Sequence, residues 1–273
     1  MIAIVTDSTA YLTHEEAVEL GVVIVPMSYS FGKDMSLNEG CIENDEHAER
    51  QVAEGIDHVH TSQATLAGFL NAFQRLRRAG YEVLCITISS RLSGTYANAV
   101  LAAKELGGGR IEVVDSLTTC SGLYLLIREA RKRIREGAKL SAVAKELKEL
   151  RKRVRMRFSV DDMAPLRRSG RLGNVRMSIS TVLNIKPILE LKDGAIVSVS
   201  LARGRVEQTR RLCAFCEGVE GEIVVNSFLA DEAAARLAVQ LAGDTREVER
   251  RRVGPVLGAH LGAGCLGVCY IER

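Results

Sequence analysis

Four short runs of mainly apolar residues, rich in Ile and Val, constrain the fold of this chain most strongly. The runs are Ile2–Val5, Val22–Val25, Val83–Ile88 and Ile111–Val114. Continuous apolar runs of this length are typical of strands that are buried on both faces of a parallel sheet. Helical segments separate them, so we expect right-handed strand–helix–strand connections and an α/β sheet.

Helix signals fill the spaces between these runs. Thr13 stands where an N-cap would, with Glu15 and Glu16 in the first turn and Gly21 just past the end. The remaining helices of the first half are predicted over Ala64–Ala79, Gly94–Leu106, Leu117–Glu136 and Leu140–Arg155.

The second half has a different pattern. An Asp193-Gly194 pair between two apolar runs predicts a β-hairpin, with strands at Leu189–Leu191 and Ile196–Val199. Further strands are expected at Met156–Val160, Glu222–Val225 and Cys265–Tyr270, and helices at Glu207–Cys216 and Asp231–Leu241. We therefore predict two α/β domains. Residues 1–153 would carry a parallel, Rossmann-like sheet, and residues 154–273 a mixed sheet with a hairpin.

Composition excludes several classes of protein. The 273 residues carry a net charge of +3, too small to indicate a nucleic-acid or anionic-membrane partner by itself. No apolar run approaches the ~18 residues of a membrane span. The first residues have no basic region or cleavage site of a signal peptide, and the seven Cys are scattered, so we expect a cytoplasmic protein with reduced thiols.

Three basic runs raise the question of nucleic-acid binding. They are Arg131–Arg135, Arg151–Arg157 and Arg250–Arg252. They lack interleaved aromatic residues and lie among Glu residues, as solvated helix faces do. We therefore expect no nucleic-acid partner.

Hydroxyl-bearing residues gather where strands are predicted to end. The clusters are Thr6–Thr9, Thr61–Gln63 and Ser89–Thr95, the last containing Ser93 and Gly94. In open α/β sheets ligands bind beyond the carboxyl ends of strands, where helix N-termini offer unpaired N–H groups. These clusters predict a site for a small anion such as a carboxylate or phosphate; the alternative is that the hydroxyls simply cap helices.

Two glycine-containing segments add further candidates. Arg171 lies between glycines in Arg167–Gly173 and could present its guanidinium to an anion, although a solvated basic turn has the same composition. His260 lies in the turn predicted at Gly258–Gly264, where it could donate a hydrogen bond to a ligand, act as an acid or base, or merely cap the turn.

Metal and nucleotide patterns are weak. Gly262–Gly267 matches G-x-G-x-x-G but opens no helix and has no acidic residue ~20 positions on, and no Walker A pattern is present. Two thiol pairs, Cys213 with Cys216 and Cys265 with Cys269, could bind zinc, but their spacing fits packed free thiols better. The imidazoles of His58 and His60 could also bind a metal, although no acidic or Cys residue follows at ligand spacing. We expect neither a metal nor a cofactor.

Taken in order, the motifs of this chain resemble the DegV family. The resemblance extends over nearly the whole chain and rests on Ile4–Ser8, Thr61–Gln63, Ile88–Tyr96, Val114–Ser116, Leu166–Leu172, Leu183–Ile188 and Gly254–His260. It implies a two-domain α/β protein that binds one long-chain fatty acid. In bacteria with a fatty acid kinase, such proteins are non-catalytic carrier subunits that hold the acid while a separate ATP-dependent kinase phosphorylates its carboxylate.

The resemblance also implies residue roles. Thr61 and Ser93 resemble the carboxylate-binding hydroxyls of the family, and Gly94 a backbone donor beside them. Arg171 and His260 resemble residues near the head group. The resemblance also implies an acyl tunnel in the second domain, for which Ile179, Leu183 and Ile188 are the candidate lining residues. Arg203 resembles a position linked to kinase docking.

The chain departs from the family pattern around the head group. Ser169 replaces the first glycine of the usual Gly-Gly-Arg, and Ala259, Leu261 and Ala263 replace two hydroxyls and a proline around His260. An alternative function from another class is an enzyme that acts on a small anionic metabolite at the same strand ends.

Overall fold

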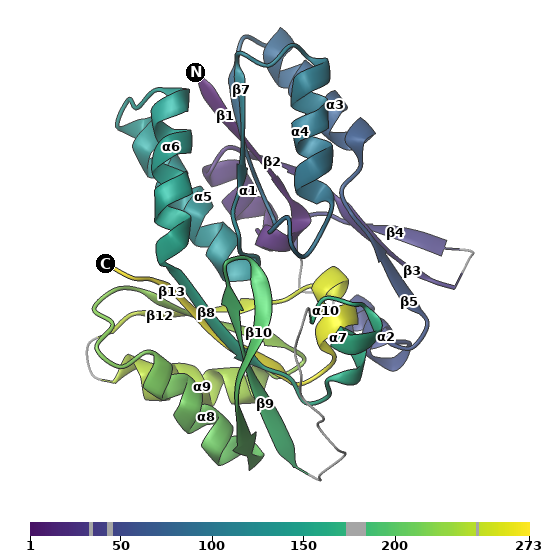
Figure 1. Cartoon of the computed structure of the whole chain (residues 1–273), viewed down its shortest axis with the longest axis vertical. Helices are drawn as coiled ribbons and strands as arrows, with labels where there is room; N and C mark the ends of the chain where they lie inside the picture. Colours follow the sequence, from purple (N-terminus) through teal and green to yellow (C-terminus); the bar gives the residue numbers. More distant parts are fainter. Residues whose placement is uncertain (33–34, 43–45, 173–183, 244–245) are drawn as a thin grey trace.

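The chain folds into three sheets with helices around them (Figure 1). The computed structural model describes residues 1–32, 35–42, 46–172, 184–243 and 246–273. A four-stranded and a six-stranded sheet form the two halves, and a small three-stranded sheet lies beside them. In the part of the chain that the structure describes, no helix has the length and apolar character needed to cross a membrane.

The sheet of the first half is parallel throughout, in the order β2-β1-β6-β7. This confirms the prediction from the Ile and Val runs; the strands are β1 (Ile2–Asp7), β2 (Val22–Val25), β6 (Glu82–Thr87) and β7 (Ile111–Asp115). Its helices are α1 (His14–Glu19), α3 (Leu66–Arg78), α4 (Thr95–Glu105), α5 (Cys120–Arg135) and α6 (Leu140–Leu150). The helix pair α3 and α4 lies on one side of the sheet and the pair α5 and α6 on the other (Figure 1). Strands β1 and β6 are therefore buried almost completely.

A small antiparallel sheet in the first half was not predicted. It has the order β4-β3-β5 and consists of β3 (Met27–Phe31), β4 (Met35–Glu39) and β5 (Val59–Ser62), with α2 (Glu46–Glu54) before its last strand. The strands are short and alternate Ser or His with apolar residues, so they lack the continuous apolar signal of the main sheet. This sheet matters for the site because β5 carries Thr61.

The six-stranded sheet of the second half is mixed, with the order β10-β9-β8-β13-β11-β12. The strands are β8 (Val154–Ser159), β9 (Ile185–Lys192), β10 (Ala195–Arg203), β11 (Ile223–Phe228), β12 (Val248–Arg252) and β13 (Cys265–Ile271). The predicted hairpin is present: β9 and β10 pair antiparallel, and Asp193 and Gly194 have the positive φ values of 49° and 81° that such a turn requires.

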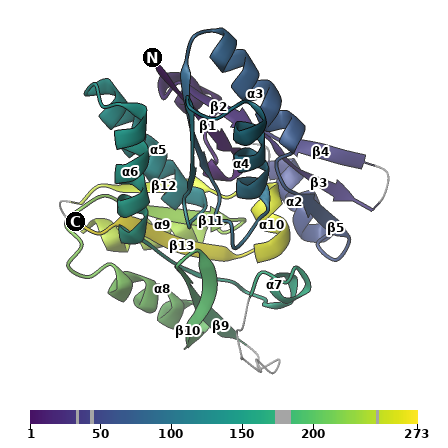
Figure 2. The same ribbon diagram turned by 45° about the horizontal axis from the view of Figure 1, so that its top comes forward.

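Helices divide between the two faces of this sheet. Figures 1 and 2 show α8 (Gly204–Phe215) and α9 (Asp231–Ala242) on the side away from the parallel sheet. The short helices α7 (Ala164–Arg168) and α10 (Pro255–Leu261) lie on the other side, toward the first half. The mixed sheet is thus enclosed between α8 and α9 on one face and the N-terminal half on the other.

Two predictions about local structure were wrong. Arg250–Arg252 is not a helix face but part of β12, which pairs in parallel with β11. Gly258–Leu261 is not a turn but the end of α10, so His260 is a helical residue. Small residues let α10 approach the sheet: a Cβ on Gly258 would lie 2.2 Å from the Phe228 ring. Helix propensity alone disfavours glycine, so tertiary packing decides this segment.

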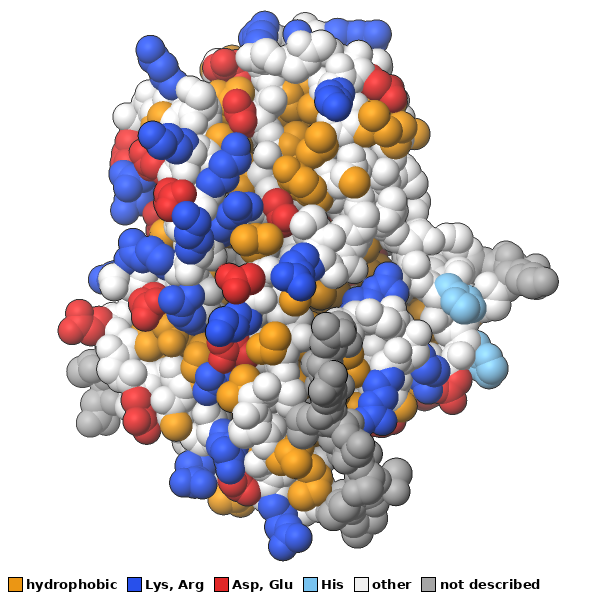
Figure 3. All heavy atoms as spheres, in the orientation of Figure 1, with side chains coloured by type: hydrophobic (Ala, Val, Ile, Leu, Met, Phe, Trp, Pro, Cys, Tyr) orange, Lys and Arg blue, Asp and Glu red, His pale blue; other side chains and the backbone are white. Residues whose placement is uncertain are grey.

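Many arginines of the basic runs are committed to internal contacts. Arg131 donates to the carbonyls of Leu20 and Gly21 at the end of α1. Arg157 pairs with Glu190 at 2.6 Å. Elsewhere Lys and Arg side chains are interspersed with Asp and Glu, as over α6 in Figure 3. These arginines therefore have a structural role, because their contacts connect helices and strands to one another.

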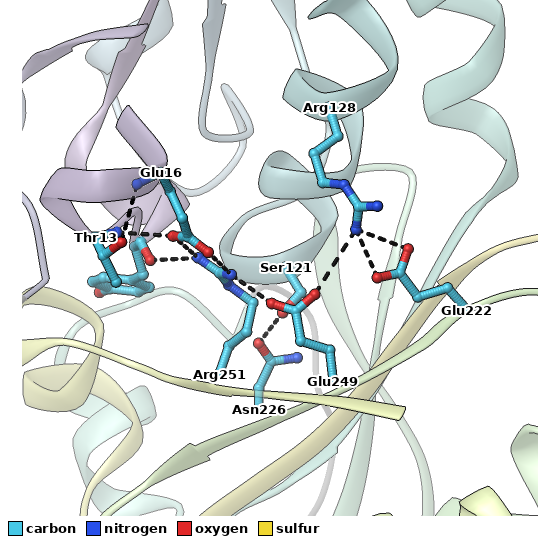
Figure 4. A network of polar contacts seen from close by, with 9 residues as sticks. Thr13, Glu16, Ser121, Arg128, Glu222, Asn226, Glu249 and Arg251 are labelled. Atoms are coloured by element: carbon cyan, nitrogen blue, oxygen red, sulfur yellow. Dashed lines mark hydrogen bonds and ion pairs between the residues drawn. The ribbon is translucent and has the colours of Figure 1, made fainter. Parts of the chain in front are cut away.

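The most buried of these arginines is Arg251 of β12, whose polar contacts connect the two halves of the chain (Figure 4). Its side chain is 7% exposed, and Nη1 lies 2.6 Å from a carboxylate oxygen of Glu16 and 2.6 Å from one of Glu249. Nη2 donates to the carbonyl of Tyr11 at 2.8 Å, and the guanidinium stacks 3.7 Å from the ring centroid of Tyr124. Three of these four partners come from the first half, so Arg251 fixes β12 against it.

Glu16 has a second role at its own helix. Thr13 Oγ1 accepts from the Glu16 N–H at 3.2 Å, and Glu16 Oε2 accepts from the Thr13 N–H at 2.8 Å. This capping box confirms the N-cap predicted at Thr13. The bonds from Arg251 and Thr13 hold the pKa of Glu16 below its ordinary value despite the cost of burial.

We predict that Arg251→Ala lowers the free energy of unfolding by about 3–5 kcal/mol, because it leaves the Glu16 and Glu249 carboxylates without their buried partner. Urea denaturation measures this. The matched control is Arg236→Ala on α9, whose pair with Glu232 is 68% and 91% exposed and should be worth at most about 1 kcal/mol. Equal effects of the two variants would contradict the role of Arg251.

Candidate functional site

A cavity of about 340 Å³ lies between the two halves of the chain. Its size falls in the range of ligand pockets. One wall comes from the strand ends and helix starts of the first half, the other from the inner face of the six-stranded sheet and from α10. The second wall is mostly apolar and includes Met156, Phe158, Leu191, Ile196, Val256 and Leu257.

The structure brings the five predicted head-group residues together at this cavity. Thr61, Ser93, Gly94, Arg171 and His260 all line it. They come from β5, the start of α4, the turn after α7, and α10. Their convergence across about 200 positions of sequence is a property of the fold that no local motif contains.

His260 of α10 and Thr61 of β5 form a polar pair at the cavity. The Thr61 hydroxyl and His260 Nε2 lie 2.8 Å apart. Burial, together with the positive charge of Arg171, lowers the pKa of His260 to about 4. The imidazole is therefore neutral at neutral pH, and can donate one hydrogen bond and accept another.

Ser93 and Gly94 lie at the N-terminus of α4. Ser93 Oγ lies 2.9 Å from Thr95 Oγ1 and accepts from the Thr95 N–H at 3.3 Å. Gly94 is the N-cap residue, and a Cβ there would lie 2.1 Å from the amide oxygen of Gln63. Glycine thus allows the Thr61–Gln63 segment to pack against the helix start, whose N–H groups favour an anion.

Arg171 marks the opening of the cavity, because it is exposed and also lines it. Its Nε donates to the Leu92 carbonyl at 3.4 Å, and Nη1 donates to the Ser169 carbonyl. The first bond places the guanidinium at Leu92, the residue before Ser93, and its charge acts on His260. The part of the cavity that Arg171 lines therefore lies close to the protein surface.

A buried carboxyl group positions α10. Glu39 of β4 accepts from the Val256 N–H at 2.8 Å and from the Ser8 hydroxyl at 2.9 Å. Burial raises its pKa to about 7, while these two bonds favour the charged form. Glu39 thereby ties the small sheet and the end of β1 to the helix that carries His260.

One predicted hydroxyl cluster is not part of the cavity. Thr6 Oγ1 donates to the Ile86 carbonyl, and the Asp7 carboxylate accepts from Thr9 and from the Ile88 N–H. These side chains join the ends of β1 and β6. The expectation that Thr6–Thr9 would contribute to an anion site is therefore wrong, because all four are buried in structural bonds.

The remaining candidates have different positions. Ile188 is fully buried on β9 but is not among the residues that line the cavity, whereas Leu191 of the same strand is. Ile179 and Leu183 lie outside the described residues. Arg203 is exposed at the end of β10, where its N–H donates to Glu207.

The candidate metal ligands do not assemble. Among the residues described, no group of three or more His, Cys, Asp or Glu side chains could hold a metal ion. Cys265 lines the cavity, and burial raises the pKa of its thiol to about 12. The thiol is therefore protonated at neutral pH and packs as an apolar group.

Three residues with polar or thiol side chains line the cavity without having been predicted: Thr119, Cys120 and Asn226. Thr119 and Cys120 follow the end of β7, so the strand-end rule that identified Ser93 also applied to them. Asn226 lies inside β11 and had no such signal.

Comparison with known proteins identifies the family of this chain. A family model described as uncharacterised protein, DegV family, matches residues 1–273. The chain belongs to the DegV family. A DegV domain-containing protein of Halalkalibacterium halodurans is 35% identical, over 100% of this chain and 99% of its own length.

Solved DegV structures share the fold over almost the full length. A DegV family protein from Thermus thermophilus, described for its fatty acid binding, is 31% identical with a TM-score of 0.86, and 99% of each chain is covered. DegV of Bacillus subtilis, described as a fatty acid binding protein, is 28% identical with a TM-score of 0.84, covering 100% of this chain and 99% of that one.

We predict that His260 makes the protein less stable in acid. Between its folded pKa of about 4 and the ordinary value near 6.5, the unfolded chain binds a proton that the folded chain does not. The free energy of unfolding should therefore fall by about 2–3 kcal/mol more in the wild type than in His260→Gln when the pH drops from about 7 to 4.5. Denaturation of lipid-stripped protein at both pH values measures this.

The control for this experiment is His60→Gln, which replaces an exposed imidazole on β5. Its pH profile should follow that of the wild type. Identical profiles for wild type and His260→Gln would contradict the assignment of a buried, neutral imidazole.

Proposed function

We propose that this chain binds one long-chain fatty acid in the cavity between its halves, with the carboxylate at Thr61, Ser93, Gly94, Arg171 and His260. The observation that carries the proposal is the polarity of the cavity, which has hydrogen-bond donors at one end and apolar side chains along the wall of the six-stranded sheet. The fatty-acid-binding DegV structures that share this fold support it.

The chemistry of the head-group end suits a carboxylate. The Ser93 hydroxyl and the N–H groups at the start of α4 can donate to a carboxylate oxygen. The Thr61 hydroxyl can donate as well while it accepts from the Nε2–H of the neutral His260 imidazole. The nearby Arg171 supplies the positive charge.

The apolar wall provides the main binding energy. Burial of a ~16-carbon chain at about 0.8 kcal/mol per CH₂ gives a gross stabilisation above about 10 kcal/mol. Ordering of the flexible chain offsets part of this gain. We expect the net binding free energy to be large enough that the acid is retained through purification.

We predict that Ser93→Ala and Thr61→Val each lower the affinity for a long-chain fatty acid roughly 5- to 150-fold, since each removes one bond to the carboxylate, worth about 1–3 kcal/mol. Native mass spectrometry after lipid stripping and reloading measures bound acid. The control is Ser90→Ala, which lies three positions before Ser93, is exposed and does not line the cavity. If the folded Ser93→Ala and Thr61→Val variants retain as much fatty acid as the wild type, these residues do not bind the carboxylate.

We further propose that the protein is a carrier in the cytoplasm, which presents the carboxylate to a separate ATP-dependent fatty acid kinase. The support is positional: the head-group end lies beside the exposed Arg171, within reach of a partner's active site. The carrier itself would perform no phosphoryl transfer.

We predict that Arg203→Ala reduces acyl-phosphate formation by such a kinase while leaving fatty acid retention unchanged, because the side chain is exposed and does not line the cavity. Phosphate transfer from ATP is measured with carrier and kinase combined. Arg236→Ala on α9 is the control for loss of a surface charge. Equal transfer by Arg203→Ala and wild type would exclude Arg203 from docking.

A further inference from the structure

The cavity is lined by two buried polar groups that the head-group assignment does not use. Asn226 and Thr119 both line the cavity, and each is 7% exposed. Asn226 Nδ2 and Thr119 Oγ1 have no hydrogen-bond partner among the described residues. They come from β11 and from the residue before α5, neither of which contributes a head-group residue.

Asn226 faces the cavity by strand geometry. Side chains alternate along β11, so Asn226 shares a face with Val224 and Phe228, which belong to the core between the two halves. Its amide oxygen accepts a hydrogen bond from the Ser121 hydroxyl, which fixes the amide plane (Figure 4). The other end of the amide, Nδ2, therefore points away from Ser121 and offers two N–H donors.

Thr119 offers a second polar group at the same cavity. It stands at the N-cap position of α5, yet its hydroxyl makes no capping bond. Its side chain interacts with the Cys120 thiol, a weak hydrogen-bonding group, and this lowers the pKa of the thiol against the larger effect of burial; no group among the described residues makes a hydrogen bond of normal geometry to Oγ1. The hydroxyl can both donate and accept.

These groups have a consequence for the ligand. Buried polar atoms are almost always hydrogen-bonded, and an unsubstituted acyl chain would leave Nδ2 and Oγ1 without a partner. An oxygen on the chain supplies the partner that each group lacks, because it can accept from the amide N–H groups and from the threonine hydroxyl.

We propose that the fatty acid this chain selects carries a hydroxyl or keto oxygen on its acyl chain, which Asn226 and Thr119 bind. The inference rests on the proposed function and deepens it, since it names the class of acid that the same cavity takes. The head-group residues would hold the carboxylate, and this second polar pair would recognise the substituent.

Competition binding tests the proposal on the full, lipid-stripped chain. Stearic acid competes against a series of hydroxystearic and oxostearic acids with the oxygen at successive carbons, and native mass spectrometry reports which acid is bound. At least one oxygenated acid should bind about tenfold more tightly than stearic acid, as expected for one added buried hydrogen bond. Asn226→Leu and Thr119→Val should each remove this preference while stearic acid still binds.

Thr87→Val is the matched control for Thr119→Val. Thr87 of β6 is also fully buried with a hydroxyl that has no partner among the described residues, but it does not line the cavity. Thr87→Val should keep the preference of the wild type. Thr119→Val is nearly isosteric, so it tests the proposal even where Asn226→Leu disturbs the bond to Ser121.

Two outcomes overturn the inference. If stearic acid binds as tightly as every oxygenated acid, the pair holds a water molecule or serves packing, while the proposed function stands. If none of the acids binds, the proposed function fails and the inference fails with it.

Discussion

The structure depends on a buried positive charge whose partners come mostly from the other half of the chain. Arg251 lies on an edge strand of the C-terminal sheet, and its guanidinium is removed from water between Glu16, Glu249 and the ring of Tyr124. Because desolvation of a charge is costly, the geometry of this cluster must be kept. Together with Glu39, which holds the start of α10, it sets how the two sheets face each other.

The cavity follows from that arrangement. Two sheets held by polar ties at their margins enclose space where small residues stand, such as Gly267 on the inner face of β13. Thr61, Ser93, Gly94, Arg171 and His260 line one part of it, and apolar side chains line the wall formed by the mixed sheet. Asn226 Nδ2 and Thr119 Oγ1 border this space without a hydrogen-bond partner among the described residues, so an oxygen on a ligand would satisfy groups that an unsubstituted chain leaves unpaired.

Much of the site was predictable, since Thr61, Ser93, Gly94, Arg171 and His260 belong to local motifs that the family resemblance assigns. Their environment was not. His260 was expected in a turn, whereas it lies on a helix that Gly258 allows against Phe228. The small sheet that carries Thr61 was missed because its strands alternate polar and apolar residues over only four or five positions. Thr6–Thr9 has the hydroxyl-rich composition of an anion site, but its side chains form hydrogen bonds that connect the ends of β1 and β6.

By itself, the sequence determined the elements whose signal is local: the parallel strands with their continuous Ile and Val runs, the capped helix at Thr13 and the Asp193-Gly194 hairpin. These follow from periodicity, capping and backbone preference, which act within a few residues. Only the tertiary structure decided which hydroxyls line the cavity, that the His260 imidazole is neutral, and that Asn226 borders the cavity. Those properties depend on burial and on partners up to about 200 positions away, and desolvation exists only once the two halves have closed on each other.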